Sequence, residues 1–113
     1  MKKFVKQLAL SLSLSLLAPF AANAAGSITG TVASIYALPM SMVVMNGTPT
    51  GTPSCASTNP NRWAMDPTTA NGQGQIALIR FAAALGKTVA IIGTGTCSLW
   101  TDTETVASIL VTN

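Results

Sequence analysis

The amino-terminal residues determine which part of this chain can form the folded domain, because they have the pattern of a segment that is removed. Residues 1–6 carry three lysines, residues 8–20 form an uncharged apolar run, and Ala22-Asn23-Ala24 has the small-x-small pattern that signal peptidase reads. This order predicts a cleavable signal peptide over residues 1–24. A membrane anchor, the alternative, needs about 20 apolar residues, and this run is shorter and contains Pro19. Cleavage near Ala24 predicts a secreted or periplasmic domain of residues 25–113 without a membrane span.

Charge then excludes one class of partner. Removing 24 of the 113 residues lowers the formal charge from +3 to zero, because the remaining three cations balance three acids. The six charged residues are Arg62, Arg80, Lys87, Asp66, Asp102 and Glu104. Nucleic-acid binding needs clustered lysine and arginine to neutralise phosphates. Three scattered cations do not form such a cluster, so we expect no nucleic-acid partner.

Two cysteines, Cys55 and Cys97, remain after cleavage. In an exported chain an even cysteine count favours a disulfide, with two free thiols as the alternative. The bond closes a loop of about 43 residues, for which the chain-entropy model gives roughly 4 kcal/mol. The chain has no histidine, so a zinc site, a Ser-His-Asp triad and a Cys-His pair are not expected. The methionines near residues 40–45 are too weak a signal for copper, and no cofactor is predicted.

Alternation of apolar and small polar residues predicts five strands in the exported domain. The predicted strands cover residues 27–36, 40–45, 62–65, 88–92 and 105–112. Three prolines and two glycines among Thr, Ser and Asn predict a loop over residues 47–61. Residues 99–104 are expected to form an exposed turn or loop.

The sequence period changes after Ala70 and predicts a helix through residues 75–85. Its apolar residues form a wide stripe made of Ile76, Leu78, Ile79, Ala82, Ala83 and Leu85. Gly86 stands where a glycine ends a helix, and Lys87 complements the negative end. Gly72 and Gly74 leave the start undefined. The order strand-strand-strand-helix-strand-strand predicts a mainly β, OB-fold-like, five-stranded Greek-key barrel with one helix, as a single domain.

Three stretches of the second half carry a family resemblance. They are Trp63, Gly86-Lys87-Thr88-Val89, and the segment from Gly93-Thr94-Gly95-Thr96-Cys97 through Trp100 to Glu104. Together they resemble small secreted bacterial proteins that are similar to the B subunit of subtilase-type AB5 toxins. The similarity covers residues 27–110 and is more specific from Trp63 onward. It implies an OB fold, a pentameric ring and binding of cell-surface sialoglycans.

Two candidate ligand-binding positions follow from this resemblance. The toxin subunit's glycan pocket uses a serine before a glycine in the first strand, and Thr29-Gly30 stands at the similar place. Threonine keeps the hydroxyl and adds a methyl group that crowds a sugar carboxylate. Asn46 would supply an amide where the toxin has a polar residue. The loop over residues 47–61 has no counterpart in the resemblance.

The residues themselves suggest a second candidate cluster of Trp100, Asp102 and Glu104. An aromatic face beside carboxylates suits sugar stacking with hydrogen bonds to hydroxyl groups. The alternative is a tryptophan that plugs one end of the barrel, with the acids in a solvated loop. Asp102 and Glu104 make a poor pair for glycoside hydrolysis, because they lie two residues apart in a short loop. Arg62 is expected to pair with a carboxylate, Trp63 to be buried, and Asp66 to form a turn.

These features predict a non-enzymatic binding module that contacts a cell-surface glycan or a protein. A homo-oligomer, with a pentamer as the candidate, fits the low charge of the exported domain, which leaves neutral surface to pack. The alternative is a periplasmic or envelope accessory domain that stabilises a protein partner. An enzyme is not predicted.

Overall fold

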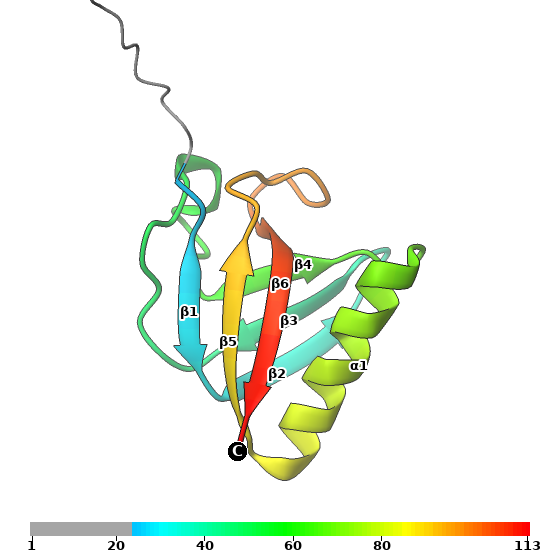
Figure 1. Cartoon of the computed structure of the whole chain (residues 1–113). Coiled ribbons are helices and arrows are strands. Elements are labelled where there is room, and N and C mark those ends of the chain that lie inside the picture. Colours follow the sequence, from blue (N-terminus) through cyan, green and yellow to red (C-terminus); the bar gives the residue numbers. More distant parts are fainter. Residues whose placement is uncertain (1–23) are drawn as a thin grey trace, which may run out of the picture.

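The computed structural model describes residues 24–113 (Figure 1). The predicted signal peptide therefore lies outside the described residues, apart from Ala24. Six strands form one mixed sheet in the order β1-β5-β6-β4-β3-β2, with one α-helix after β4. All neighbouring strands are antiparallel except β4 and β6, which are parallel. The strands are β1 Ser27–Gly30, β2 Val32–Ala37, β3 Ser41–Met45, β4 Arg62–Met65, β5 Thr88–Gly93 and β6 Glu104–Thr112.

The mainly β class with one helix is confirmed, but the number of strands differs from the prediction. The stretch predicted as one strand over residues 27–36 is divided at Thr31, because its two halves pair with different strands. β1 pairs with β5, whereas β2 pairs with β3. The Thr31 carbonyl accepts a hydrogen bond from the Asn46 amide at 2.8 Å. Gly30 permits this approach, since a Cβ there would lie 1.8 Å from the Asn46 carbonyl oxygen.

Helix α1 spans Ala70–Leu85, so it begins at the change of sequence period and includes the two glycines that left its start undefined. Thr69 caps it, because its hydroxyl accepts the Gly72 amide at 3.0 Å. Asp66 forms the expected turn before the helix, and hydrogen bonds from the Thr68 hydroxyl and amide hold the pKa of Asp66 below its ordinary value. Gly86 ends the helix in the left-handed conformation with φ 66°, as predicted.

The helix packs against β2, β4, β5 and β6 and closes the core on one side of the curved sheet (Figure 1). Its buried apolar side chains are Ile76, Ile79 and Ala82. Trp63 is buried among them as expected, at 1% exposure. The predicted stripe is too wide, however, because Leu78 and Leu85 are 42% and 58% exposed and Ala83 is exposed. The sheet covers only a narrow face of α1.

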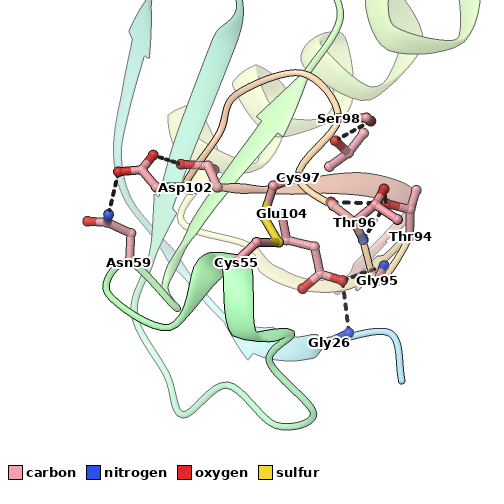
Figure 2. The surroundings of a disulfide bond; sticks show 12 residues. Gly26, Cys55, Asn59, Thr94, Gly95, Thr96, Cys97, Ser98, Asp102 and Glu104 are labelled. Carbon is pink, nitrogen blue, oxygen red and sulfur yellow. Dashed lines mark hydrogen bonds between the residues drawn. A yellow bond between two sulfur atoms is a disulfide. The ribbon is translucent and has the colours of Figure 1, made fainter. Parts of the chain in front are cut away.

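The predicted disulfide between Cys55 and Cys97 is present, with the two Cα atoms 6.2 Å apart (Figure 2). Cys55 lies on the short 3-10 helix η1, Ser54–Ala56, inside the loop between β3 and β4, residues 46–61, called here the 46–61 loop. Cys97 lies in the loop between β5 and β6, residues 94–103, called here the 94–103 loop. The bond joins two loops that are far apart in sequence at one end of the sheet. Within residues 24–113, no helix has the length and apolar character needed to cross a membrane.

Candidate functional site

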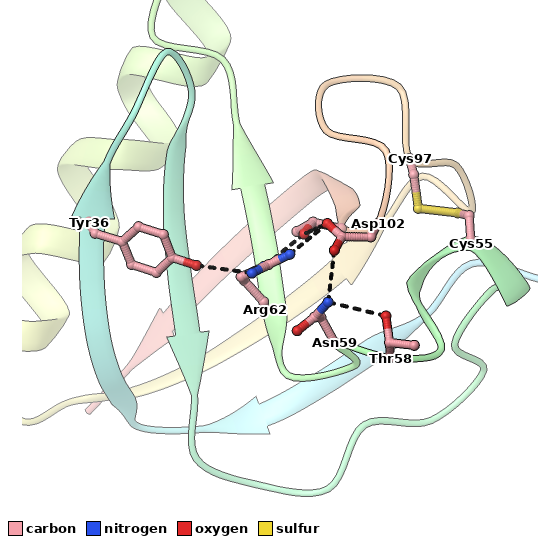
Figure 3. A network of polar contacts seen from close by, with 8 residues as sticks. Tyr36, Cys55, Thr58, Asn59, Arg62, Cys97 and Asp102 are labelled. Carbon is pink, nitrogen blue, oxygen red and sulfur yellow. Dashed lines mark hydrogen bonds and ion pairs between the residues drawn. A yellow bond between two sulfur atoms is a disulfide. The ribbon is translucent and has the colours of Figure 1, made fainter.

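Arg62, the first residue of β4, is the centre of a polar network that lies next to the two disulfide-joined loops (Figure 3). Its Nη2 donates to Asp102 Oδ1 at 2.6 Å, and its Nε donates to Thr103 Oγ1 at 2.8 Å. Its Nη1 donates to the Tyr36 hydroxyl of β2 at 3.4 Å. The expected pairing of Arg62 with a carboxylate is therefore confirmed, and Asp102 is its partner.

The network keeps the guanidinium charged and fixed in direction. Partial burial of Arg62 works against the charged form, but hydrogen bonds to Tyr36 and Asp102 outweigh it and raise the pKa of the guanidinium above its ordinary value. The side chain is only 21% exposed. Arg62 is thus a rigid donor whose positive charge is balanced by the carboxylate of Asp102.

Asn59 extends this network into the 46–61 loop. Its Nδ2 donates to Asp102 Oδ2 at 3.0 Å and to the Thr58 hydroxyl at 3.2 Å. Asp102 therefore bridges the strand and the loop, with one oxygen toward Arg62 and the other toward Asn59 (Figure 3). The Cys55–Cys97 bond joins the same two loops, so it helps to hold Asn59 against Asp102.

A surface hollow of about 310 Å³ opens next to this network. It lies over β2, β3 and β4 and is lined by Tyr36, Val44, Thr58, Asn59, Pro60, Asn61 and Arg62. Asn61 is fixed by two hydrogen bonds from its Nδ2, to the carbonyl oxygens of Met45 and Gly47, each 2.9 Å long. The hollow therefore combines an aromatic ring, apolar carbons, guanidinium donors and amide oxygens. This combination suits a ligand with both C–H faces and hydroxyl groups.

Of the residues predicted as ligand-binding, the structure places Asp102 beside this hollow. Trp100 lies two residues away in the 94–103 loop, where it is half-buried and forms a bridge with Thr103. Thr29 and Asn46 come together at a different place, around the β1–β2 junction, where both are exposed. There Asn46 Nδ2 donates to the Thr31 hydroxyl at 3.0 Å. The predicted positions therefore fall in separate regions of the molecule.

Glu104 occupies a third environment, inside the fold. It is 2% exposed, and its Oε2 accepts the amides of Gly26 at 2.9 Å and Gly95 at 2.8 Å (Figure 2). A Cβ at Gly93 would lie 2.0 Å from the same oxygen, so the surrounding backbone fits closely around the carboxylate. Asp102 and Glu104, two residues apart in the sequence, thus lie in different environments, because the Asp102 side chain is 44% exposed and Glu104 is buried.

Sequence reasoning missed most of the residues that line the hollow. The sequence places Tyr36 on a strand and Asn59 and Asn61 in a loop rich in polar residues, without marking them as ligand contacts. The usable sequence signal is Arg62, whose charge predicts a carboxylate partner and so points to the polar network beside the hollow. The register that sets β2 beside β3, with Tyr36 opposite Met42, cannot be obtained from alternation alone.

No group of three or more His, Cys, Asp or Glu residues that could hold a metal ion occurs within residues 24–113. Comparisons with family models, with curated proteins and with solved structures found no match for this chain.

Proposed function

We propose that this chain is an exported, non-enzymatic binding domain that holds a carbohydrate in the hollow over β2, β3 and β4. The observation that carries the proposal is the network of Tyr36, Arg62, Asp102 and Asn59 beside that hollow. Sugars are recognised by an aromatic or apolar platform together with fixed polar groups. In this hollow the fixed groups come from a strand and from a disulfide-joined loop, so they are held before a ligand arrives.

The strand order supports an OB-type barrel as the scaffold. If β1 and β2 are taken as one strand bent at Thr31, that strand pairs with β5 on one side and with β3 on the other. The sheet order then closes on itself with five strands, and α1 lies between the third and the fourth. OB folds bind oligosaccharides on the face of their second and third strands and the adjoining loops. In this chain those strands are β3 and β4, which border the hollow.

Export is the part of the proposal that rests on the amino terminus and the disulfide. A signal peptide over residues 1–24 delivers the domain to an oxidising compartment, where the Cys55–Cys97 bond is stable. The resemblance to AB5 B subunits adds a reason to look for a glycan ligand.

A glycan array probed with the exported, oxidised protein tests the proposal, and Tyr36→Ala is its diagnostic variant. We expect Tyr36→Ala to weaken binding of a captured glycan by about tenfold or more, which corresponds to about 1.4 kcal/mol, because the ring supplies the apolar platform. Ile92→Ala is the matched control, since Ile92 is an apolar residue of β5 that is also 52% exposed, and it lies outside both the hollow and the exposed face of α1. An array without binding, or equal losses in both variants, would contradict a glycan site at this hollow.

A second candidate function, docking to a protein, is favoured by the exposed side of α1. Leu78, Phe81 and Leu85 are spaced at i, i+3 and i+7 and are 42–58% exposed, so they share one helix face. A groove of about 480 Å³ lies between α1 and β6, and Leu78 is one of the residues that line it. Monomeric proteins rarely leave large contiguous apolar patches uncovered. This face would be covered in a ring of identical chains or by a partner of an accessory domain.

The solution mass of the oxidised protein separates these assemblies. Light scattering after size exclusion is expected to give about five times the monomer mass if the chain forms the ring that B subunits form. Phe81→Ser would then lower the mass, because it places a hydroxyl in the apolar contact. A monomer for both proteins would contradict the ring and leave a different protein as the occupant of this face.

A further inference from the structure

Charge is balanced at the hollow, and this balance restricts what it can bind. Arg62 is the cation that lines it, and Asp102 Oδ1 lies 2.6 Å from Arg62 Nη2. The remaining charged residues of the part that the structure describes lie elsewhere. Asp66 is in the turn before α1, Arg80 and Lys87 are on α1 and just after it, and Glu104 is buried. A ligand in the hollow therefore meets a nearly neutral surface.

The residues that line the hollow still have both hydrogen-bond donors and hydrogen-bond acceptors available for a ligand. A guanidinium has five N–H groups, and three of those on Arg62 are directed to Thr103, Tyr36 and Asp102, which leaves two for a ligand. Asn59 and Asn61 use Nδ2 for their contacts within the fold, so each can offer Oδ1 as an acceptor. The Asn59 oxygen points away from Asp102 in Figure 3.

We propose that the hollow selects uncharged, polyhydroxylated ligands, meaning neutral saccharides, and discriminates against saccharides that carry a carboxylate. This inference rests on the proposed function and names the ligand class of that same site. A sugar hydroxyl both donates and accepts hydrogen bonds, so it can satisfy an amide oxygen and a guanidinium N–H together. A carboxylate accepts only, so it would face the oxygens of Asn59 and Asn61 without a proton to share. The ligand's carboxylate would also compete with Asp102 for Arg62, and the negative charge of Asp102 would repel it.

The expected specificity differs from what the AB5 resemblance implies. B subunits of that type bind sialoglycans, which carry an acidic sugar. In this chain the guanidinium that would attract such a sugar is already paired. The difference arises from a residue pair at the hollow, Arg62 and Asp102, and does not involve Thr29.

The test compares uncharged and acidic sugars of similar size. The oxidised, exported protein is titrated with lactose, maltose, cellobiose and chitobiose, and with sialyllactose and a glucuronic-acid disaccharide, while backbone amide resonances are followed. We expect the neutral sugars that bind to shift resonances around Arg62 and Asn59. Their affinity should change less than about twofold between low salt and about 0.3 M NaCl, because no net charge is involved. The acidic sugars should bind at least about tenfold more weakly.

Asp102→Asn provides the diagnostic variant, because it removes the carboxylate charge and keeps the size of the side chain. We expect it to raise affinity for acidic sugars at low salt and to lose that gain at about 0.3 M NaCl. Arg80→Gln, which removes an exposed cation from α1, should change neither affinity. If acidic sugars bind the unaltered protein more tightly than neutral ones, the inference is wrong while the proposed function stands. If no saccharide binds, the proposed function fails and the inference with it.

Discussion

Replacing both cysteines with serine is expected to lower the free energy of unfolding by about 4 kcal/mol. Cys55 and Cys97 are 42 positions apart, so the bond restricts a large part of the unfolded chain. Small domains have total stabilities of roughly 5–15 kcal/mol, so this loss is a large fraction. For a domain of this size, it corresponds to a fall in Tm of roughly 15–30 °C.

Urea unfolding of the oxidised protein and of the Cys55→Ser/Cys97→Ser variant measures this effect. Ser54→Ala/Thr101→Ala is the control, because it also changes two exposed residues of the same two loops and leaves the bond intact. Reducing the unaltered protein should reproduce the loss seen in the double serine variant. A loss below about 1 kcal/mol would mean that the reduced, unfolded chain retains structure that already brings the loops together.

Loss of the disulfide is also expected to affect ligand binding in the hollow. Asn59 meets Asp102 across the two loops that the bond joins, at 3.0 Å. Without the bond, the two loops must become ordered when the ligand binds, and this ordering costs conformational entropy. The affinity for a saccharide should therefore decrease even where the variant remains folded.

The local elements of this fold were predictable because the signals for them are local. Alternation of apolar and polar residues marked every strand to within a residue or two at each end, apart from one division. The division at Thr31 arises because the chain changes its pairing partner from β5 to β3 there. Which strand pairs with which depends on residues that are distant in sequence, so the alternation within one strand cannot predict its neighbour.

The helix shows a related limit of sequence patterns. Apolar residues on both sides of a helix predict a wide buried stripe, yet Leu78 and Leu85 remain 42% and 58% exposed. Periodicity identifies which residues share a face, and the width of the partner surface decides which of them become buried. The same excess of apolar residues is what makes this side of α1 a candidate docking face.

The candidate site was predictable only in part. The pairing of Arg62 with an acid follows from the cost of leaving a charge alone on a partly buried strand. The sequence does not show which acid pairs with Arg62 or which asparagines surround the pair. The two loops that carry these residues are joined by cysteines 42 positions apart, and only the fold and the disulfide bring them together. Sequence adjacency was also misleading, since it grouped Asp102 with Glu104 although the two lie in different environments.

Glu104→Ala is expected to cost roughly 3 kcal/mol or more of unfolding free energy, since hydrogen bonds to charged groups contribute about 1.5–3 kcal/mol each. The substitution removes the acceptor of two buried amides, those of Gly26 and Gly95. These donors lie on the entry to β1 and in the 94–103 loop, so Glu104 joins the amino-terminal end of the domain to the disulfide-linked loop (Figure 2). The change also leaves a cavity against Trp63.

Glu104→Gln separates the roles of charge and shape. Its amide oxygen can accept the same two bonds, so we expect an intermediate loss, about half that of Glu104→Ala, because the bonds are no longer charge-assisted. Urea unfolding gives both values, and Asp66→Ala, which disrupts an exposed turn, is the comparison for loss of a carboxylate at the surface. A Glu104→Ala protein as stable as the unaltered one would contradict the structural role.

Saccharide binding by Glu104→Gln then decides whether this residue also touches ligand. The carboxylate is 2% exposed, and one of its oxygens is engaged by the backbone on two sides. We therefore expect the variant to bind saccharides with unchanged affinity once folded, in contrast to Tyr36→Ala. A folded Glu104→Gln protein that has lost binding would move the ligand from the hollow over β2–β4 to the end of the sheet where Glu104 meets Gly26 and Gly95.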